Sequence, residues 1–166
     1  MKSILILALF ISSLVADSST IEDIDKLMQT KEYKKAFELA SKECDKNNTL
    51  ACHIKGYMYD QGLSVKQDYK KAFKLYKRAC DAKIYDACID LGMMYDQGKG
   101  VKQDYKKAYD LYKYACDNKS ARGCFGQGFL MGMGKGVKKD RYKALKLFQK
   151  SCYLGFELGC QAVSGK

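Results

Sequence analysis

A spacing of 36 residues runs through almost the whole sequence and constrains its fold more than any other feature. The segment DYKKAFKLYKRAC at 68–80 returns as DYKKAYDLYKYAC at 104–116 and as DRYKALKLFQKSC at 140–152. An earlier copy, EYKKAFELASKEC, begins at residue 32. A fixed period of this length is typical of a solenoid, in which each supersecondary unit packs mainly against its neighbours. The repetition therefore predicts one repeat array over 32–166.

Each repeat is predicted to contain two helices. Within 69–80, apolar residues recur at steps of three and four, which is the pattern of an amphipathic helix, and Asp68 precedes it as an N-cap. The other helix is expected over about 85–97, because Gly98 follows it where a left-handed cap favours glycine. The predicted fold is an all-α solenoid of helix-turn-helix units. Its units are expected at about 49–84, 85–120 and 121–156, with partial units at both ends and an N-terminal capping helix at 17–31.

The eight cysteines form four pairs, and the members of each pair are eight residues apart. On one unbroken helix this spacing would separate the two Cα atoms by about 12 Å, whereas a disulfide needs them within about 7 Å. In the helical pattern, however, the first cysteine of a pair ends one helix and the second begins the next. The turn between them can therefore bring the thiols together. We predict one disulfide in each repeat: Cys44–Cys52, Cys80–Cys88, Cys116–Cys124 and Cys152–Cys160.

Metal and redox chemistry fit these cysteines less well. Structural zinc sites use cysteines two to four residues apart or cysteines combined with histidine, and His53 is the single histidine of the sequence. The haem motif C-x-x-C-H and the redox motif C-x-x-C are both absent from it. We therefore expect a structural role for all the cysteines, with no metal and no cofactor.

The first 16 residues, MKSILILALFISSLVA, have the features of a secretory signal peptide. One lysine precedes an apolar run that ends on a small residue, and the run is too short for a transmembrane helix. Cleavage is expected after Ala16, and no second apolar run follows. The leader and the even number of cysteines predict a protein that is secreted or periplasmic, without stable membrane insertion.

The formal net charge is +11, with lysines in every repeat and only three arginines. An excess of positive charge can attract anionic partners such as acidic glycans, cell-wall polymers or membrane headgroups. Nucleic-acid sites usually rely on arginine for bidentate contacts, so the composition argues against a nucleic-acid partner. The even distribution of the lysines along the repeats favours a solvated, lysine-rich surface.

One repeat motif is complete within residues 87–108: Ala87, Gly92, Tyr95, Gly98, Gly100, Val101, Asp104, Lys107 and Ala108. This pattern resembles the SEL-like repeat, a relative of the tetratricopeptide repeat, and the resemblance covers about residues 32–166. The added cysteine pair makes the chain similar to the Helicobacter cysteine-rich protein family of secreted proteins. The resemblance implies a right-handed α/α superhelix. It also implies a concave groove, lined by the first helix of each repeat, that binds peptides or proteins.

The same resemblance implies a second function, because members of that family are described as penicillin-binding proteins or weak β-lactamases. The residues give this activity little support. The serine β-lactamase motifs S-x-x-K, S-D-N and K-T-G are absent from the sequence, and one histidine cannot build a zinc β-lactamase site. Enzymatic activity therefore stays open as an alternative. It would be a weak hydrolysis of the β-lactam ring, and no catalytic residue can be named for it.

Candidate groove residues lie on the first helices, on the side opposite the repeated alanine, leucine and tyrosine positions. They are His53, Tyr57, Asp60, Asp90, Met93, Asp96, Phe125 and Phe129. Tyr57, Met93 and Phe129 occupy equivalent positions and form an apolar column bordered by carboxylates and amides. Such a column suits an extended peptide, and the alternative is that it packs between neighbouring repeats. His53 has no nucleophile beside it in the sequence, so we expect a groove or surface side chain rather than a catalyst.

The leading prediction is an exported, monomeric scaffold that binds a peptide, a protein or a cell-wall fragment in this groove. The enzyme alternative would bind a β-lactam or a peptidoglycan-derived ligand.

One modification is also predicted. Asn47-Asn48-Thr49 is a glycosylation sequon with Asp45 two positions before the first asparagine, which makes Asn47 a candidate for N-glycosylation in a host with that pathway. The alternative is that these residues only form a polar turn that caps the next helix.

Overall fold

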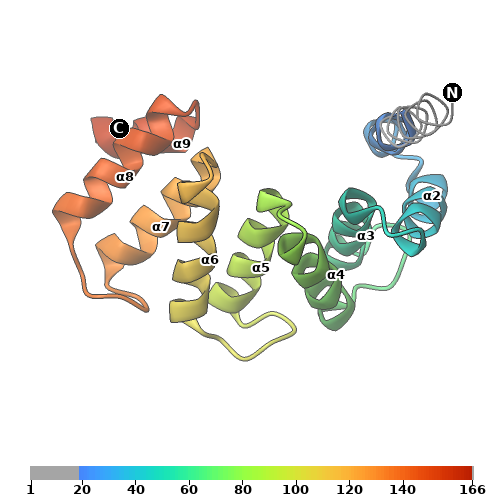
Figure 1. The fold of residues 1–166 in the computed structure, drawn as a ribbon, viewed down its shortest axis with the longest axis horizontal. Helices are drawn as coiled ribbons and strands as arrows, with labels where there is room; N and C mark the ends of the chain where they lie inside the picture. The colour runs from blue at the N-terminus through green and yellow to red at the C-terminus, as the bar shows by residue number, and fades with distance from the viewer. Residues whose placement is uncertain (1–18, 166) are drawn as a thin grey trace, which may run out of the picture.

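The computed structural model describes residues 19–165, and this part of the chain is built of helices and loops without a strand. A helical segment at 19–29 precedes eight helices that follow one another along the solenoid (Figure 1). Their bounds are α2 Tyr33–Asp45, α3 Thr49–Gln61, α4 Tyr69–Asp81, α5 Tyr85–Gln97, α6 Tyr105–Asp117, α7 Ala121–Met133, α8 Arg141–Tyr153 and α9 Glu157–Ser164. The predicted leader, residues 1–16, lies outside the described residues. No helix of the described part is long and apolar enough to span a membrane.

Local capping sets where the helices begin and end. The Asp68 carboxylate accepts the backbone N–H of Lys71 at 3.0 Å at the start of α4, and Asp104 and Asp140 cap α6 and α8 in the same way. Such a bond satisfies one of the backbone donors that a helix leaves free at its first turn. The helices α3, α5 and α7 end at a glycine in the left-handed conformation: Gly62, Gly98 and Gly134.

The helices form two sets, which we call the A helices (α3, α5, α7 and α9) and the B helices (α2, α4, α6 and α8). Each helix packs against its neighbours in sequence, and the A helices α5 and α7 also touch each other across a repeat boundary. The same alanine position is buried in every B helix: Ala36, Ala72, Ala108 and Ala144. Its small side chain allows close approach of the packed helices. The prediction of an all-α repeat solenoid is confirmed.

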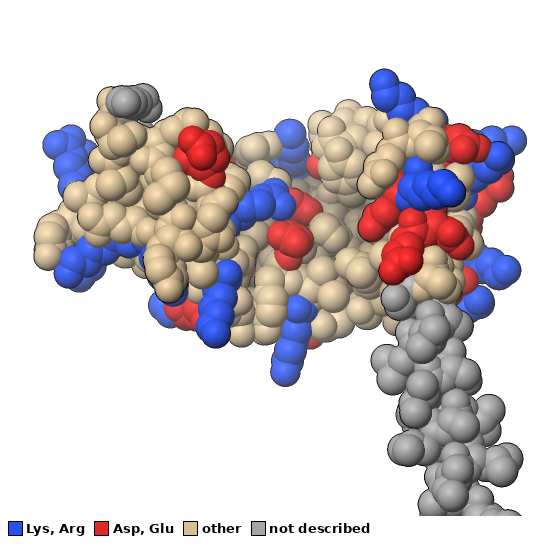
Figure 2. Space-filling view, turned by 90° about the horizontal axis from the view of Figure 1, so that it is seen from above, with Lys and Arg blue, Asp and Glu red and all other residues tan. Residues whose placement is uncertain are grey.

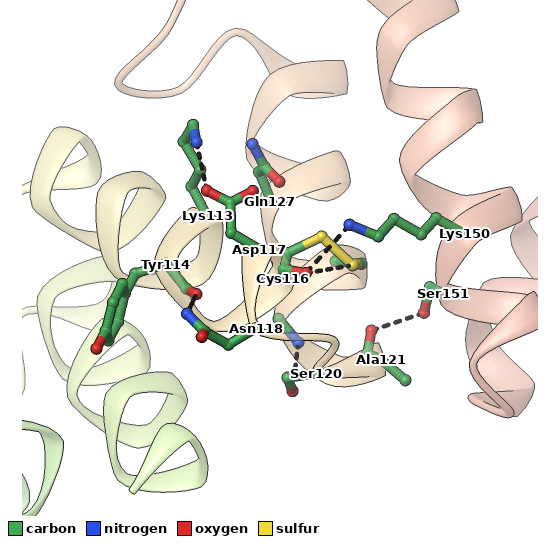
Figure 3. Close-up of a disulfide and its surroundings, with 12 residues drawn as sticks. Lys113, Tyr114, Cys116, Asp117, Asn118, Ser120, Ala121, Gln127, Lys150 and Ser151 are labelled. Carbon is green, nitrogen blue, oxygen red and sulfur yellow. Dashed lines mark hydrogen bonds and ion pairs between the residues drawn. A yellow bond between two sulfur atoms is a disulfide. The ribbon is translucent and has the colours of Figure 1, made fainter. Parts of the chain in front are cut away.

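A disulfide closes each corner between a B helix and the A helix that follows it. The two Cα atoms of each bridge lie 4.4–4.7 Å apart, and the described residues contain no free cysteine. Figure 3 shows one of them, Cys116–Cys124, at the turn between α6 and α7. The turn contains Lys119 in the left-handed conformation, with φ of 65°. The predicted disulfide in each repeat is therefore present.

Side chains of the next repeat bind two of these corners, those of Cys44 and Cys116. Lys150 of α8 donates a hydrogen bond to the carbonyl oxygen of Cys116 at 3.1 Å, and the Ser151 hydroxyl donates to the Ala121 carbonyl at 2.8 Å (Figure 3). Arg78 of α4 binds the Cys44 carbonyl at 3.2 Å in the equivalent way. A cation is favourable there because the last carbonyls of a helix carry partial negative charge. These hydrogen bonds therefore connect each of the two corners to the repeat that follows it.

Candidate functional site

The predicted groove residues lie on the A helices α3, α5 and α7, and the apolar column among them is accessible to solvent. Tyr57 is 43% exposed and Phe129 is 45% exposed, although both are large and largely apolar. Met93 lies at the equivalent position of α5 and is half-buried. Met133, one turn beyond Phe129, is 57% exposed. Large apolar side chains that gather on one face are typical of a binding surface.

A hollow of about 260 Å³ lies on this face between α5 and α7. Four of the predicted residues meet there: Met93, Asp96, Phe125 and Phe129. The other lining residues are Ile89, Gln97, Tyr112, Arg122, Gly126 and Phe156. Of these, Tyr112, Arg122 and Phe156 lie outside the predicted groove side. The hollow therefore has aromatic and aliphatic walls, with a carboxylate, an amide and a guanidinium among its lining groups.

Tyr112 reaches the hollow from the B helix behind it. Its ring lies against two glycines of neighbouring A helices, where a Cβ on Gly92 would come within 2.8 Å of the ring and a Cβ on Gly126 within 2.9 Å. Burial raises the pKa of the Tyr112 hydroxyl well above its ordinary value, and the nearby carboxylates of Asp96 and Asp90 raise this pKa further. The tyrosine is thus a neutral part of the hollow's floor.

Tyr76 occupies the same position one repeat earlier and is almost completely buried. Its ring packs against Gly56 and lies 5.6 Å, centroid to centroid, from the ring of His53. Burial raises the pKa of the Tyr76 hydroxyl, and the carboxylates of Asp90 and Asp60 add to this increase. Two successive B helices therefore supply a tyrosine to the floor of the A-helix face.

A chain of polar contacts crosses the face from α3 through α5 to α7. His53 Nε2 of α3 lies 2.7 Å from Asp90 Oδ2 of α5. The second oxygen of Asp90 lies 3.6 Å from Arg122 Nη2 of α7, and Arg122 Nη1 lies 3.5 Å from Asp86 Oδ1. We call His53, Asp90, Arg122 and Asp86 the polar ladder. It joins three repeats and holds the Arg122 guanidinium beside the hollow.

The groups on this face are suited to binding a ligand. His53 Nε2 is bound to the Asp90 carboxylate, which fixes the orientation of the imidazole on this face. Within residues 19–165, no group of three or more histidine, cysteine, aspartate or glutamate side chains could hold a metal ion. Apolar walls with a few fixed polar groups are typical of ligand-binding surfaces.

The candidate glycosylation site lies at the first corner. Asn47 is exposed and left-handed, with φ of 70°, and its side-chain oxygen accepts a hydrogen bond from Arg78 Nη2 at 2.7 Å. The neighbouring Asn48 caps α3 through the backbone N–H of Ala51. A glycan would attach to Nδ2 of Asn47, whereas Arg78 binds Oδ1, so the modification and this contact are compatible. Glycosylation of Asn47 stays a prediction.

Comparison with known proteins gives the architecture a name. The Sel1 repeat model matches residues 50–83, 86–120 and 121–156. Among solved structures, the chain is similar to a Sel1 repeat protein from Oxalobacter formigenes, with a TM-score of 0.79 and 32% identity over 86% of this chain and 58% of that one. It is also similar to cysteine rich protein B of Helicobacter pylori, with a TM-score of 0.61 and 33% identity over 79% of this chain and 94% of that one.

A third similar structure is c5321, a protective antigen of uropathogenic Escherichia coli with an SLR fold, which has a TM-score of 0.72 and 27% identity over 78% of this chain. Our chain spans 28% of c5321 and 58% of the Oxalobacter protein. No curated protein matches the sequence significantly. Neither the Sel1 repeat model nor the names of these three proteins mention a β-lactamase or penicillin binding, so they lend that alternative no support. The family model covers more than half of the chain, and the chain belongs to the Sel1 repeat family.

Proposed function

We propose that this protein is an exported scaffold that binds an extended peptide segment of a partner protein across α3, α5 and α7. The observation that carries the proposal is the column of Tyr57, Met93 and Phe129, which supplies one apolar side chain per repeat on an accessible face. A peptide that crosses successive A helices could place a side chain against each member in turn. Peptide grooves commonly combine such anchor positions with polar groups that fix the main chain.

The polar groups beside the column suggest the chemistry of the peptide. Asp60 and Asp96 lie one turn beyond Tyr57 and Met93 on the same helices, and Gln97 follows Asp96. Carboxylates at these positions favour lysine or arginine in the ligand, and amides can bond its main chain. The hollow between α5 and α7 is of a size to take a large apolar side chain. We therefore expect a peptide with apolar anchors and at least one basic residue.

Export is the second part of the proposal. Disulfides in all four repeats indicate an extracytoplasmic location, since they persist in oxidising compartments and are rare in the cytosol. The similarity to a Helicobacter cysteine rich protein supports the same location. The apolar segment 1–16 would supply the signal for export, into either the periplasm or the medium.

The test is selection of peptides from a random displayed library on the oxidised protein, followed by affinity measurement with the synthetic peptides. The key variant combines Tyr57→Ala with Phe129→Ala, and we expect it to weaken binding by about 10-fold or more, as loss of two interface anchors does. Because both side chains are more than two-fifths exposed, the melting temperature should fall little.

A matched control combines Tyr142→Ala with Tyr153→Ala, which removes two tyrosines that are 68% and 90% exposed on the B helix α8. This control should bind the selected peptides as the parent protein does. If the groove variant unfolds at a much lower temperature yet still binds the peptides with full affinity, the column serves repeat packing and the proposal is wrong.

A further inference from the structure

The positive charge of this protein is concentrated in one part of each repeat. The segments 62–71, 98–107 and 134–143 hold the loop from an A helix to a B helix and the first turn of that B helix. We call these 30 residues the loop edge. They contain twelve Lys or Arg and three Asp, a net charge of +9, whereas the whole chain has +11. Lysines that recur evenly along the sequence are therefore not spread evenly over the solenoid.

The hairpin topology places the three segments on the same edge. Because A and B helices alternate in direction, all A-to-B loops lie at one end of the helices and the disulfide corners lie at the other. In Figure 1 the loops before α6 and α8 lie along the lower edge. The corner segments 42–51, 78–87, 114–123 and 150–159 contain seven Lys or Arg and six Asp or Glu. Figure 2, which looks onto the corner edge from above, shows charged side chains of both signs there.

The loop edge is continuous from repeat to repeat. Gly100 is left-handed, with φ of 69°, and lies so close to the first turn of α4 that an added Cβ would come within 2.6 Å of the Tyr69 carbonyl carbon and oxygen. Gly136 contacts Tyr105 in the first turn of α6 in the same way. The second and third loops therefore pack on the start of the preceding B helix, and these two contacts join the three basic segments.

The acidic groups of the edge are already engaged. Asp68, Asp104 and Asp140 cap their helices, and each lies 3.4–3.7 Å from the ammonium group of the lysine three residues later. Two further lysines, Lys99 and Lys135, lie over the rings of Tyr69 and Tyr105 at 5.5 and 4.8 Å. Lys106 pairs with Asp110 of its own helix. An exposed lysine at one equivalent position of each loop has none of these contacts: Lys66, Lys102 and Lys138.

We propose that the loop edge binds a linear acidic polysaccharide. A row of lysine ammonium groups acts as a series of point charges, which suits carboxylate or sulfate groups repeated along a flexible polymer. The loops follow one another along one border of the solenoid (Figure 1), so a linear polymer can meet them in turn. Nucleic acid is disfavoured because base stacking needs open aromatic faces, whereas a lysine ammonium group lies over each of the edge's rings: Tyr69, Tyr105 and Tyr142.

This surface is separate from the groove proposed above, so the two proposals can fail independently. The test measures binding of the oxidised protein to dextran sulfate, with uncharged dextran as the matched probe, over a series of salt concentrations. The key variant combines Lys66→Gln, Lys102→Gln and Lys138→Gln. Release of counterions from a polyanion makes affinity fall with salt, and each lost contact reduces the slope of log K against log salt by about one. We expect a slope smaller by roughly two to three and an affinity about 10-fold lower at low salt.

A charge-matched control combines Lys42→Gln, Lys83→Gln and Lys119→Gln, which are exposed lysines at the corner edge. It should keep the parent slope, and the Tyr57→Ala/Phe129→Ala variant should also bind dextran sulfate normally. Equal loss in the two lysine triples would overturn the proposal, since net charge alone would then explain binding. Tighter binding to single-stranded DNA or to vesicles with anionic lipid would also overturn it and would assign the edge to those partners.

Discussion

His53 Nε2 lies 2.7 Å from Asp90 Oδ2 and joins two A helices across a repeat boundary. The two side chains are only 16% and 12% exposed, and Asp90 also lies near Arg122 of the following repeat. In a solenoid, each repeat is stabilised mainly by contacts with its immediate neighbours. A hydrogen-bonded ionisable pair at such a boundary therefore fixes how one repeat sits on the next.

The first prediction concerns the energy of this pair. A double-mutant cycle with His53→Ala and Asp90→Ala, measured by urea unfolding, should give a coupling energy of about 1 kcal/mol, because hydrogen bonds to a carboxylate away from bulk water contribute at that level. The matched cycle pairs His53→Ala with Asp86→Ala, since Asp86 contacts Arg122 but not the histidine. Additive effects in both cycles would mean that the His53–Asp90 contact does not stabilise the repeat boundary.

The second prediction concerns the glycines that face Tyr112. Gly126→Ala places a Cβ 2.9 Å from the ring, so we expect a loss of roughly 1–3 kcal/mol from overpacking. Gly132→Ala is the matched substitution in the same helix, where the new Cβ would meet only the Ala144 Cβ at 3.4 Å. That variant should be neutral or slightly stabilised because alanine favours the helix. Urea unfolding of both variants checks the difference, and equal losses would contradict close packing at Tyr112.

The helix positions could be predicted from the sequence because local signals set them. The predicted bounds 85–97 coincide with α5, since Gly98 ends the helix in a left-handed cap. The cysteine pairing could also be predicted from the sequence, because a turn between two helices brings cysteines eight residues apart close together. Glu32 marks the limit of such signals. It precedes α2 but makes no side-chain cap, and its carboxylate binds Lys35 instead.

The contacts across the A-helix face could not be predicted in the same way, because they join residues that are not equivalent in the repeat. Asp90 lies 37 positions after His53, one residue out of phase with the period. The next repeat has Gly126 at the position equivalent to Asp90. This difference between repeats is the sequence signal that Asp90 makes a contact that the other repeats lack. Tyr112 belongs to a B helix, so the pattern of the A helices alone does not reveal its place in the floor of the hollow. Which side chains meet across a groove depends on packing that the periodicity does not encode.

The third prediction concerns the order in which the disulfides are reduced. Cys152 and Cys160 are half-buried, whereas Cys44, Cys52, Cys116 and Cys124 are 0–1% exposed. Thiol–disulfide exchange requires access of the attacking thiolate to a sulfur atom. Limited treatment with dithiothreitol followed by alkylation and mass spectrometry should therefore label Cys152 and Cys160 first. Earlier labelling of an internal pair would show that local opening, rather than burial in the folded chain, controls reduction.

The fourth prediction concerns stability in acid. The backbone N–H of the residue three positions later donates to Asp68, Asp104 and Asp140, and this bond lowers the pKa of each carboxyl below its ordinary value. The unfolded chain then binds protons more readily than the folded one. The stabilisation is therefore present above about pH 4 and is lost as the pH falls through the lowered pKa values. The melting temperature of the parent protein should decline steeply below about pH 4.

Asparagine can keep the capping hydrogen bond without titrating, so replacement of the three aspartates by asparagine provides the test. We expect little change in melting temperature at pH 7 and a shallower decline below about pH 4, measured by circular dichroism. The control variant replaces Asp81, Asp110 and Asp117 by asparagine and so removes the same number of carboxylates. These three aspartates bind lysine side chains rather than backbone N–H groups. If both variants flatten the acid decline equally, the loss of negative charge and not the helix caps determines the acid sensitivity.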